Sequence, residues 1–176
     1  GGPIQVYSYT IAPSLLRSPS PVVGRFRVVT GDGDGQVHAF NGFSQDWTYQ
    51  TGGAIVNAPA LALDGTVYVK AGDGKLYAIA QDGELRWSRT VGQGLGSPKI
   101  GADGSIYVGG SDDQGPGGAE RYSLGRYNPI DGSLLGLAEV DGRIDMAPSM
   151  DAHGDVWVGT SHGLLYRMSC DPEVEA

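Results

Sequence analysis

Cysteine is almost absent from this chain, whose 176 residues contain only Cys170. A single thiol cannot form an intrachain disulfide, and no CxxC or Cys/His spacing typical of zinc sites occurs. No apolar run approaches the length of about 20 residues that a membrane-spanning helix needs. Basic residues are also few, with 12 Lys and Arg against 20 Asp and Glu and a net charge of −8. Because phosphate contacts require clustered Lys and Arg, we expect no nucleic-acid partner and no membrane insertion.

Motifs for catalysis are missing as well. Gly-x-Ser-x-Gly is absent, and no Ser/His/Asp arrangement has a recognisable spacing. The segment Gly92–Gly96 resembles a dinucleotide loop, but it precedes an expected strand rather than a helix, so it cannot present a helix N-terminus to a pyrophosphate. The histidines are scattered: we expect His38 within a strand and His153 and His162 beside turns. The sequence therefore nominates no catalytic residue.

Glycine, in contrast, is abundant, at 30 of 176 residues against a usual share of about 7 %. Strands rich in Val, Ile and Tyr surround it, which indicates many short strands joined by tight turns. Much of the acidic charge belongs to those turns, where Asp stabilises nearby backbone and need not bind a partner. The Asp residues that directly precede Gly at such turns are Asp64, Asp73, Asp82, Asp103, Asp131 and Asp141.

An internal repeat organises the whole chain. Four Ala/Ser-Pro pairs end at Pro21, Pro59, Pro98 and Pro148, with intervals of 38, 39 and 50 residues. Each pair is followed by a strand, a turn and further strands, so the repeat unit is a run of antiparallel hairpins. This frame assigns 1–17 to an outer strand and a connection, 18–57 to blade 1, 58–96 to blade 2, 97–146 to blade 3 with an insertion at 111–123, 147–170 to blade 4 without its outer strand, and 171–176 to a polar tail.

Sheets of this size bury both faces only when they stand side by side around an axis. The expected fold class is therefore all-β, a β-propeller of four-stranded antiparallel blades within one domain, residues 1–176. Three arrangements remain open: a four-bladed ring, half of an eight-bladed ring completed by a second copy, or a fragment of a larger propeller. The alignment of Gln5–Thr10 with Arg86–Thr90 predicts that the chain begins with an outer strand, which can close blade 4 in cis or in trans.

Two sets of three residues in the repeat resemble the tryptophan-docking pattern of PQQ-like propeller repeats. The sets are Ala39, Gly42 and Trp47, and Ala78, Gly83 and Trp87. The resemblance implies that each Trp packs on the Ala and Gly of a neighbouring blade. Blade 3 departs from the pattern, because Leu134-Leu135-Gly136 stands where Trp is expected.

The same resemblance has functional implications. The family includes quinoprotein dehydrogenases, the lipoprotein of the bacterial outer-membrane protein assembly machine, and secreted repeat proteins, and this chain is most similar to the branch without enzymatic activity. It has one Cys where several of the enzymes carry an adjacent pair, and no residue maps to their Asp base. We therefore expect no enzyme, no PQQ, and a periplasmic or extracellular, bacterial-type location.

Two segments are candidates for ligand binding. Asp32 and Asp34 alternate with Gly and could supply calcium ligands, although a third acid is missing and a plain turn is the competing interpretation. The insertion in blade 3 is the other, because propellers carry function on loops of one face. Its candidate contact residues are Asp112, Asp113, Glu120, Arg121 and Tyr122.

The sequence thus predicts a non-catalytic interaction or scaffold module that binds protein or glycan through loops on one face, with no cofactor apart from calcium as an open option. The alternative is a fragment or subunit of a quinone- or calcium-dependent propeller enzyme. A homodimer that completes a larger ring is a further partner hypothesis.

Overall fold

The computed structural model describes residues 21–24, 27–42, 44–94, 96–112 and 120–169 of the chain. Every regular element in these ranges is a β-strand. The same ranges contain no helix that is long and apolar enough to cross a membrane. The strands form four antiparallel sheets in which chain order equals spatial order. The all-β prediction is confirmed.

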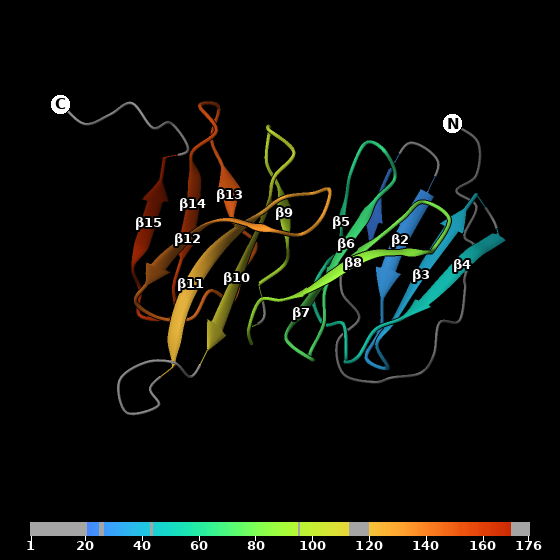
Figure 1. Cartoon of the computed structure of the whole chain (residues 1–176), viewed down its shortest axis with the longest axis horizontal. Coiled ribbons are helices and arrows are strands. Elements are labelled where there is room, and N and C mark those ends of the chain that lie inside the picture. Colours follow the sequence, from blue (N-terminus) through green and yellow to red (C-terminus); the bar gives the residue numbers. More distant parts are fainter. Residues whose placement is uncertain (1–20, 25–26, 43, 95, 113–119, 170–176) are drawn as a thin grey trace, which may run out of the picture.

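The four sheets follow one another along the chain (Figure 1). Sheet 1 contains β1 (Val22–Val23), β2 (Arg27–Gly31), β3 (Gln36–Asn41) and β4 (Ser44–Gln50). Sheet 2 contains β5 (Ala60–Leu61), β6 (Val67–Lys70), β7 (Lys75–Ile79) and β8 (Leu85–Thr90). Sheet 3 contains β9 (Lys99–Ile100), β10 (Ile106–Asp112), β11 (Arg121–Tyr127) and β12 (Leu134–Val140). Within the described residues sheet 4 has three strands, β13 (Ser149–Met150), β14 (Val156–Gly159) and β15 (Leu165–Met168).

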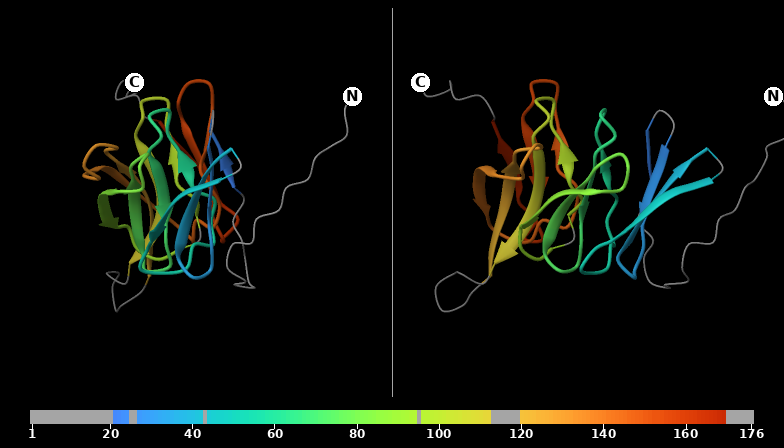
Figure 2. Two further views of the ribbon diagram at one scale, coloured as in Figure 1. Left: turned by 90° about the vertical axis from the view of Figure 1, so that its right-hand side faces the viewer. Right: turned by 45° about the vertical axis from the view of Figure 1, so that its right-hand side comes forward.

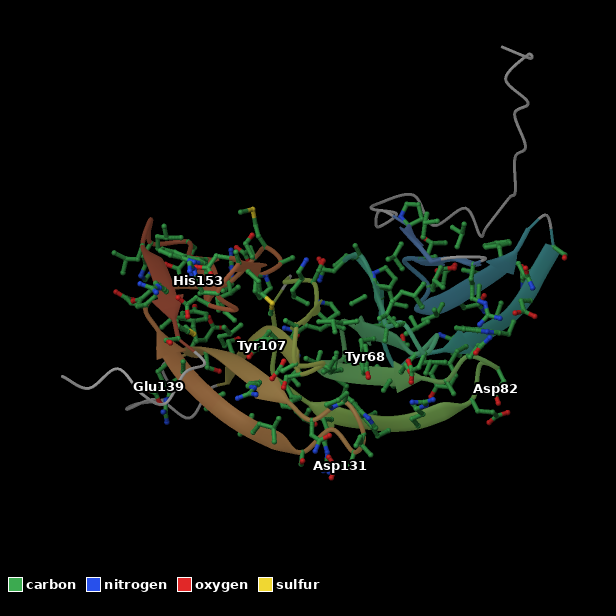
Figure 3. All side chains as sticks on the ribbon, turned by 90° about the horizontal axis from the view of Figure 1, so that it is seen from above. Tyr68, Asp82, Tyr107, Asp131, Glu139 and His153 are labelled. Atoms are coloured by element: carbon green, nitrogen blue, oxygen red, sulfur yellow. The ribbon has the colours of Figure 1, made fainter. Side chains whose placement is uncertain are left out.

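The sheets stand side by side along an arc, as propeller blades do (Figure 3). The short first strands of neighbouring sheets meet, β1 against β5 and β5 against β9. Sheets 1 and 4 stand at the two ends of the arc and leave the ring open. The ends of β2, β6, β10 and β14 lie together along one edge of the arc, which we call the hairpin face (Figure 2).

The hydrophobic core consists of the three layers between neighbouring sheets. Buried aliphatic side chains dominate each layer. Because both faces of an interior sheet are covered, its strands do not show a regular alternation of apolar and polar residues. The layer between sheets 1 and 2 centres on Val29, Ile55 and Val69, that between sheets 2 and 3 on Leu76 and Ile106, and that between sheets 3 and 4 on Leu124, Ile144 and Val156.

Two tryptophans lock consecutive sheets together. Trp47 of β4 donates its indole N–H to the carbonyl of Gln81 at 2.8 Å, and a Cβ atom at Gly83 would lie 2.9 Å from its Cγ. Trp87 of β8 donates to Pro129 O at 3.0 Å, and a Cβ atom at Gly132 would lie 2.6 Å from its Cε3. Each indole therefore lies on a glycine of the following sheet that has no room for a side chain.

The alanines of the docking pattern have a different place from the one that the resemblance implied. Ala39 pairs with Trp47, and Ala78 with Trp87, across strands of the same sheet. At the corresponding position of sheet 3, Arg126 pairs with Gly136, so the contact between sheets 3 and 4 has no tryptophan. The remaining glycine of the pattern, Gly42, has no atom of the described chain within 4 Å of its Cβ position.

A second kind of contact joins a strand residue of each sheet to a residue of the connection that follows the sheet. After sheets 1 and 3 the strand residue is glycine and the connection residue is isoleucine; after sheet 2 the strand residue is the large one and the connection residue is glycine. A Cβ atom at Gly31 would lie 2.6 Å from Cβ of Ile55, and one at Gly109 would lie 2.7 Å from Cβ of Ile144. In sheet 2 the strand position is Lys70, and the glycine is in the connection instead, at Gly94. A Cβ atom at Gly94 would lie 3.3 Å from the Lys70 Nζ. The lysine side chain therefore takes the space that isoleucine fills at the other two contacts.

Candidate functional site

The stem of the insertion in sheet 3 lies on the hairpin face (Figure 1). β10 ends at Asp112, which pairs with Arg121 of β11; Asp113 lies outside the described residues. The Tyr122 hydroxyl donates to the Glu120 carboxylate, and Arg121 forms an ion pair with Glu139 of β12. Four of the five predicted ligand-binding residues, Asp112, Glu120, Arg121 and Tyr122, thus lie at or next to the paired ends of β10 and β11.

Two residues that sequence reasoning did not nominate complete this cluster. Arg143 and Asp145 lie in the connection from sheet 3 to sheet 4, and the Arg143 Nε lies 3.0 Å from the Asp145 Oδ1. The Arg143 backbone N–H donates to Ser161 Oγ of sheet 4 at 3.0 Å. Aligning the connections on their Ala/Ser-Pro pairs would have found them, since Ala54 and Val56 stand at these positions after sheet 1. We call Glu120, Arg121, Tyr122, Glu139, Arg143 and Asp145 the charged rim.

The pKa values in and below the charged rim are displaced by their neighbours. The hydrogen bond to Glu120 raises the pKa of Tyr122, and Asp145 raises that of Arg143. Below them, burial lowers the pKa of Lys70 to about 8, although the negative charge of Asp145 opposes the shift. Lys70 is 2 % exposed, and its ammonium donates to the carbonyls of Gly109 and Gln93.

Each carboxylate of the charged rim is paired with another side chain of the charged rim. Glu120 accepts from the Tyr122 hydroxyl, and Glu139 and Asp145 form ion pairs with Arg121 and Arg143. Across the described parts of the chain, no three or more His, Cys, Asp or Glu side chains are grouped as metal ligands would be. Exposed Arg and Tyr side chains, in contrast, are enriched in protein interfaces.

Next to the charged rim, β12 exposes an apolar edge. Leu134, Leu135 and Leu137 are 54 %, 49 % and 54 % exposed, and Ile130 in the preceding turn is 81 % exposed. β12 is the outermost strand of sheet 3, and Leu135 lies at a β-bulge. The outermost strands of sheets 1 and 2 carry Asp46, Arg86 and Arg89 along their length, and charges of this kind protect a sheet edge from pairing with another chain. We call Ile130, Leu134, Leu135 and Leu137 the leucine edge.

The two proposed calcium ligands do not converge. Asp32 is 1 % exposed, and its Oδ1 accepts the N–H groups of Asp34 and Gln36 at 3.0 and 2.8 Å. Its Oδ2 lies 2.9 Å from the His38 Nε2. Burial raises the pKa of Asp32, but the hydrogen bonds from His38 and Gln36 outweigh it and leave this pKa below its usual value. Asp34 is exposed, so the geometry is that of a turn stabilised by one carboxylate.

Replacement of Asp32 by Ala tests this turn. We expect the free energy of unfolding to fall by about 2–3 kcal/mol, because two backbone N–H groups and His38 lose a buried partner. Urea unfolding measures the change, and Asp34→Ala is the matched control, with an expected cost below about 0.5 kcal/mol. We expect millimolar calcium to leave the melting temperature of the unmodified chain unchanged; a calcium-dependent rise that Asp32→Ala removes would establish a metal site instead.

A groove of about 830 Å³ lies between sheets 1 and 2, at the end opposite the hairpin face. Val23, Leu61 and Leu63 give it apolar walls. Its polar groups are already engaged, since Arg27 contacts Asp46 and the Gln81 carbonyl, and Asp64 accepts from Thr66 and Arg86. The groove therefore offers shape but few free polar groups to orient a ligand.

Antiparallel sheets side by side along an arc, locked by tryptophan on glycine, define an incomplete turn of a β-propeller. The family model described as outer membrane protein assembly factor BamB matches residues 8–163. The chain belongs to this family of PQQ-like propeller repeats, as the tryptophan pattern predicted. No curated protein sequence matches the chain significantly.

Solved structures agree on the fold. BamB from Moraxella catarrhalis superposes with a TM-score of 0.68 at 15 % identity, over 81 % of this chain and 46 % of that one. The WD40 β-propeller domain of Doa1 gives 0.67 at 15 % identity, over 88 % and 50 %. Quinohemoprotein alcohol dehydrogenase from Comamonas testosteroni gives 0.66 at 18 % identity, over 82 % and 29 %. The chain thus spans half or less of the length of these propellers.

Proposed function

We propose that this chain is a non-catalytic protein-interaction module, and that sheet 3 carries its contact surface. The observation that carries the proposal is the leucine edge, where three leucines are about half exposed on an outermost strand. Exposed apolar side chains beside a free strand edge mark a place where another chain can pair and bury them.

The charged rim supports the same surface. Arg121 and Tyr122 lie on β11 at the insertion stem, and Glu139 of β12 forms an ion pair with Arg121. An apolar centre bordered by paired charges is the usual build of a protein interface, in which the centre supplies affinity and the charges supply specificity. We infer that the preferred partner is an extended peptide segment that adds a strand to β12. A glycan would use the charged rim alone, because sugars gain little from aliphatic side chains.

Selection from a phage-displayed library of random ten-residue peptides tests the proposal. We expect bound peptides to alternate apolar and polar residues and to slow amide hydrogen exchange in β12. The variant Leu135→Asp/Leu137→Asp should weaken their binding at least about tenfold. Ser88→Asp, on the outermost strand of sheet 2, is the matched control and should bind as the unmodified chain does.

Two outcomes would refute this contact surface. One is equal binding of the selected peptides to the unmodified chain and to Leu135→Asp/Leu137→Asp. The other is exchange protection that falls on another sheet and spares β12. Both leucines are exposed and outside the core, so we expect the variants to fold. Circular dichroism of each variant checks that the sheet content is retained.

The competing hypothesis is that the chain is a fragment or subunit of a quinone- or calcium-dependent enzyme. The fold that it shares with a quinohemoprotein alcohol dehydrogenase is compatible with this hypothesis. Calorimetric titration with PQQ and calcium separates the two functions, since an interaction module gives no heat with the quinone. The family description, outer membrane protein assembly factor, supports a location in the bacterial cell envelope, periplasmic or extracellular, and a protein partner in preference to a glycan.

A further inference from the structure

The backbone groups that β12 leaves for a partner belong to alternate residues. The Asn128 N–H donates to the Ser133 carbonyl at 2.8 Å and closes the turn between β11 and β12. Antiparallel pairs alternate between residues that bond across the pair and residues whose N–H and C=O groups point away from it. Counted from this bond and through the bulge of β12, the residues of the second kind are Leu134, Leu137 and Glu139. Within the described residues no further strand lies beside β12, so these groups face a free edge.

Two of these residues also share one face of sheet 3. Leu137 and Glu139 are two positions apart in the strand, so their side chains lie on the same side of the sheet. Gly125 of β11 is directly inward of Leu137, and a Cβ atom there would lie 2.5 Å from the Tyr127 Cε2, so the tyrosine ring covers this glycine. Leu137 is 54 % exposed, and the Glu139 side chain is 62 % exposed. The free edge therefore presents an apolar side chain and, next to it, a carboxylate.

This combination distinguishes β12 from the outermost strands of sheets 1 and 2. Each of the three strands contains a bulge, from which the positions can be counted. The residues that correspond to Leu137 and Glu139 are Ser88 and Thr90 in β8, and Thr48 and Gln50 in β4. All four are polar and uncharged. A strand beside β4 or β8 would find neither an apolar side chain nor a charge at these positions, so partner selection is expected at β12.

An added strand meets the negative member of an ion pair first. Glu139 is on the outermost strand, whereas its partner Arg121 is on β11, one strand further in. Neighbouring strands are about 4.8 Å apart, so an added strand lies directly beside Glu139 and twice as far from the backbone of Arg121. Figure 3 shows Glu139 on the outer, convex side of the arc. A basic side chain opposite Glu139 forms a favourable cross-strand pair, and an acidic one forms an unfavourable pair.

We propose that the partner strand runs antiparallel to β12 and carries a basic residue two positions before an apolar one. This inference rests on the function proposed above and names the chemistry of its partner. Directly opposite residues of an antiparallel pair lie on the same face. The partner residue opposite Glu139 therefore lies beside the carboxylate. Because the strands run in opposite directions, the residue two positions later in the partner lies beside Leu137.

The antiparallel direction follows from the sheet itself. All strands of sheet 3 are antiparallel to their neighbours, and antiparallel pairing is more stable per residue than parallel pairing. The motif is thus Lys or Arg, then any residue, then Leu, Ile or Val. A parallel partner would need the reverse order, with the apolar residue first.

Three synthetic ten-residue peptides test the motif. They share one threonine-rich sequence and differ only at two positions that are two residues apart, which carry Lys-x-Leu, Glu-x-Leu or Leu-x-Lys. Fluorescence anisotropy measures their dissociation constants. We expect Lys-x-Leu to bind about tenfold more tightly than either of the others. Its advantage over Glu-x-Leu should shrink at about 0.5 M salt, because both charges are exposed to solvent.

Variants of the chain assign the preference to Glu139. Glu139→Lys should reverse it, so that Glu-x-Leu binds about tenfold more tightly than Lys-x-Leu. Glu139→Gln, which keeps the shape of the side chain, should bind the two peptides about equally. Arg121→Gln should increase the preference for Lys, because it removes the competing cation. Thr90→Lys, at the corresponding position of sheet 2, is the matched control and should keep the preference of the unmodified chain.

Different outcomes overturn the motif and the contact surface. Peptides that slow amide exchange in β12 but bind equally with Lys and with Glu overturn the motif and leave the contact surface in place. A preference for Lys that Glu139→Gln and Glu139→Lys leave unchanged overturns it too. Tightest binding of Leu-x-Lys overturns the antiparallel direction. If none of the peptides slows exchange in β12, the contact surface is wrong and the motif is wrong with it.

Discussion

Replacing Trp87 by Ala is expected to lower the free energy of unfolding by about 3–4 kcal/mol, the usual cost of deleting a buried tryptophan. The indole is 8 % exposed, packs 5.9 Å from the Tyr68 ring between centroids, and donates to Pro129 O. The variant leaves a cavity between sheets 2 and 3 and removes one of the two donors to the Pro129 carbonyl, so that only the Tyr68 hydroxyl is left. Urea unfolding monitored by circular dichroism measures the change. Trp157→Ala is the control, with a cost near 1 kcal/mol, because Trp157 lies on the open face of sheet 4 and is half-buried.

A double-mutant cycle with Gly132→Ala assigns the contact. In the unmodified chain the new methyl group would collide with the indole, and the alanine backbone would have to keep the φ of 69° that Gly132 has. We therefore expect the free energy of unfolding to fall by about 3 kcal/mol or more. With Trp87→Ala already present the collision with the indole is gone. The Arg89 Cγ would still lie 2.9 Å from the new methyl group, but this flexible side chain can move, so mainly the backbone strain of about 1 kcal/mol is left. Losses that simply add would show that Trp87 and Gly132 do not contact each other.

The second large effect concerns Lys70 and pH. Its pKa is about 8 in the folded chain against about 10.5 when unfolded. Between these values the unfolded chain holds more protons than the folded one, so stability rises as pH increases. Below pH 8 both states are charged, and the folded state bears the cost of a buried ammonium. We expect the chain to gain about 2–3 kcal/mol relative to Lys70→Met between pH 7 and pH 10.

Comparison with Lys70→Met at each pH removes the titration of all other groups. Tyr68 and Tyr77 have pKa values raised to about 12, mainly by burial, so they destabilise the fold only above about pH 10. The measurements therefore stop at that pH. A difference that falls between pH 7 and pH 10 would mean that the carbonyls of Gly109 and Gln93 hold the ammonium more strongly than burial opposes it. The variant Lys70→Gly, which copies the strand residue found at Gly31 and Gly109, should lose the pH dependence.

The fold was predictable because its signals are local and repeated. Four Pro-anchored repeats with Gly turns specify antiparallel hairpins, and Ala78, Gly83 and Trp87 identified the propeller family. The same signals could not show that Ala78 faces Trp87 within one sheet, because cross-strand register depends on the bulge between Ala78 and Ile79. The open arc depends on how sheets meet, which no single repeat encodes.

The candidate site was only partly predictable. The length of the insertion pointed to Glu120, Arg121 and Tyr122, since a long hairpin interrupts an otherwise regular interval. Arg143 and Asp145 were missed because they are distant in sequence and meet the stem only through the packing of sheets 3 and 4. Asp32 and Asp34 looked like metal ligands in sequence, yet a buried His38 takes one oxygen of Asp32, and that contact depends on tertiary structure.

Sheet 2 has Lys70 against Gly94 where sheets 1 and 3 have glycine against isoleucine. This difference also affects the order in which the sheets pack during folding. Near-identical blades can pair in the wrong sequence, since an apolar contact made for one neighbour fits another. Sheet 2 cannot accept a connection that carries isoleucine, because Lys70 already fills that space, and a connection with glycine leaves a void against Gly31 or Gly109. This single polar contact gives the junction between sheets 2 and 3 an identity of its own, so misordered blades are less stable than the native succession.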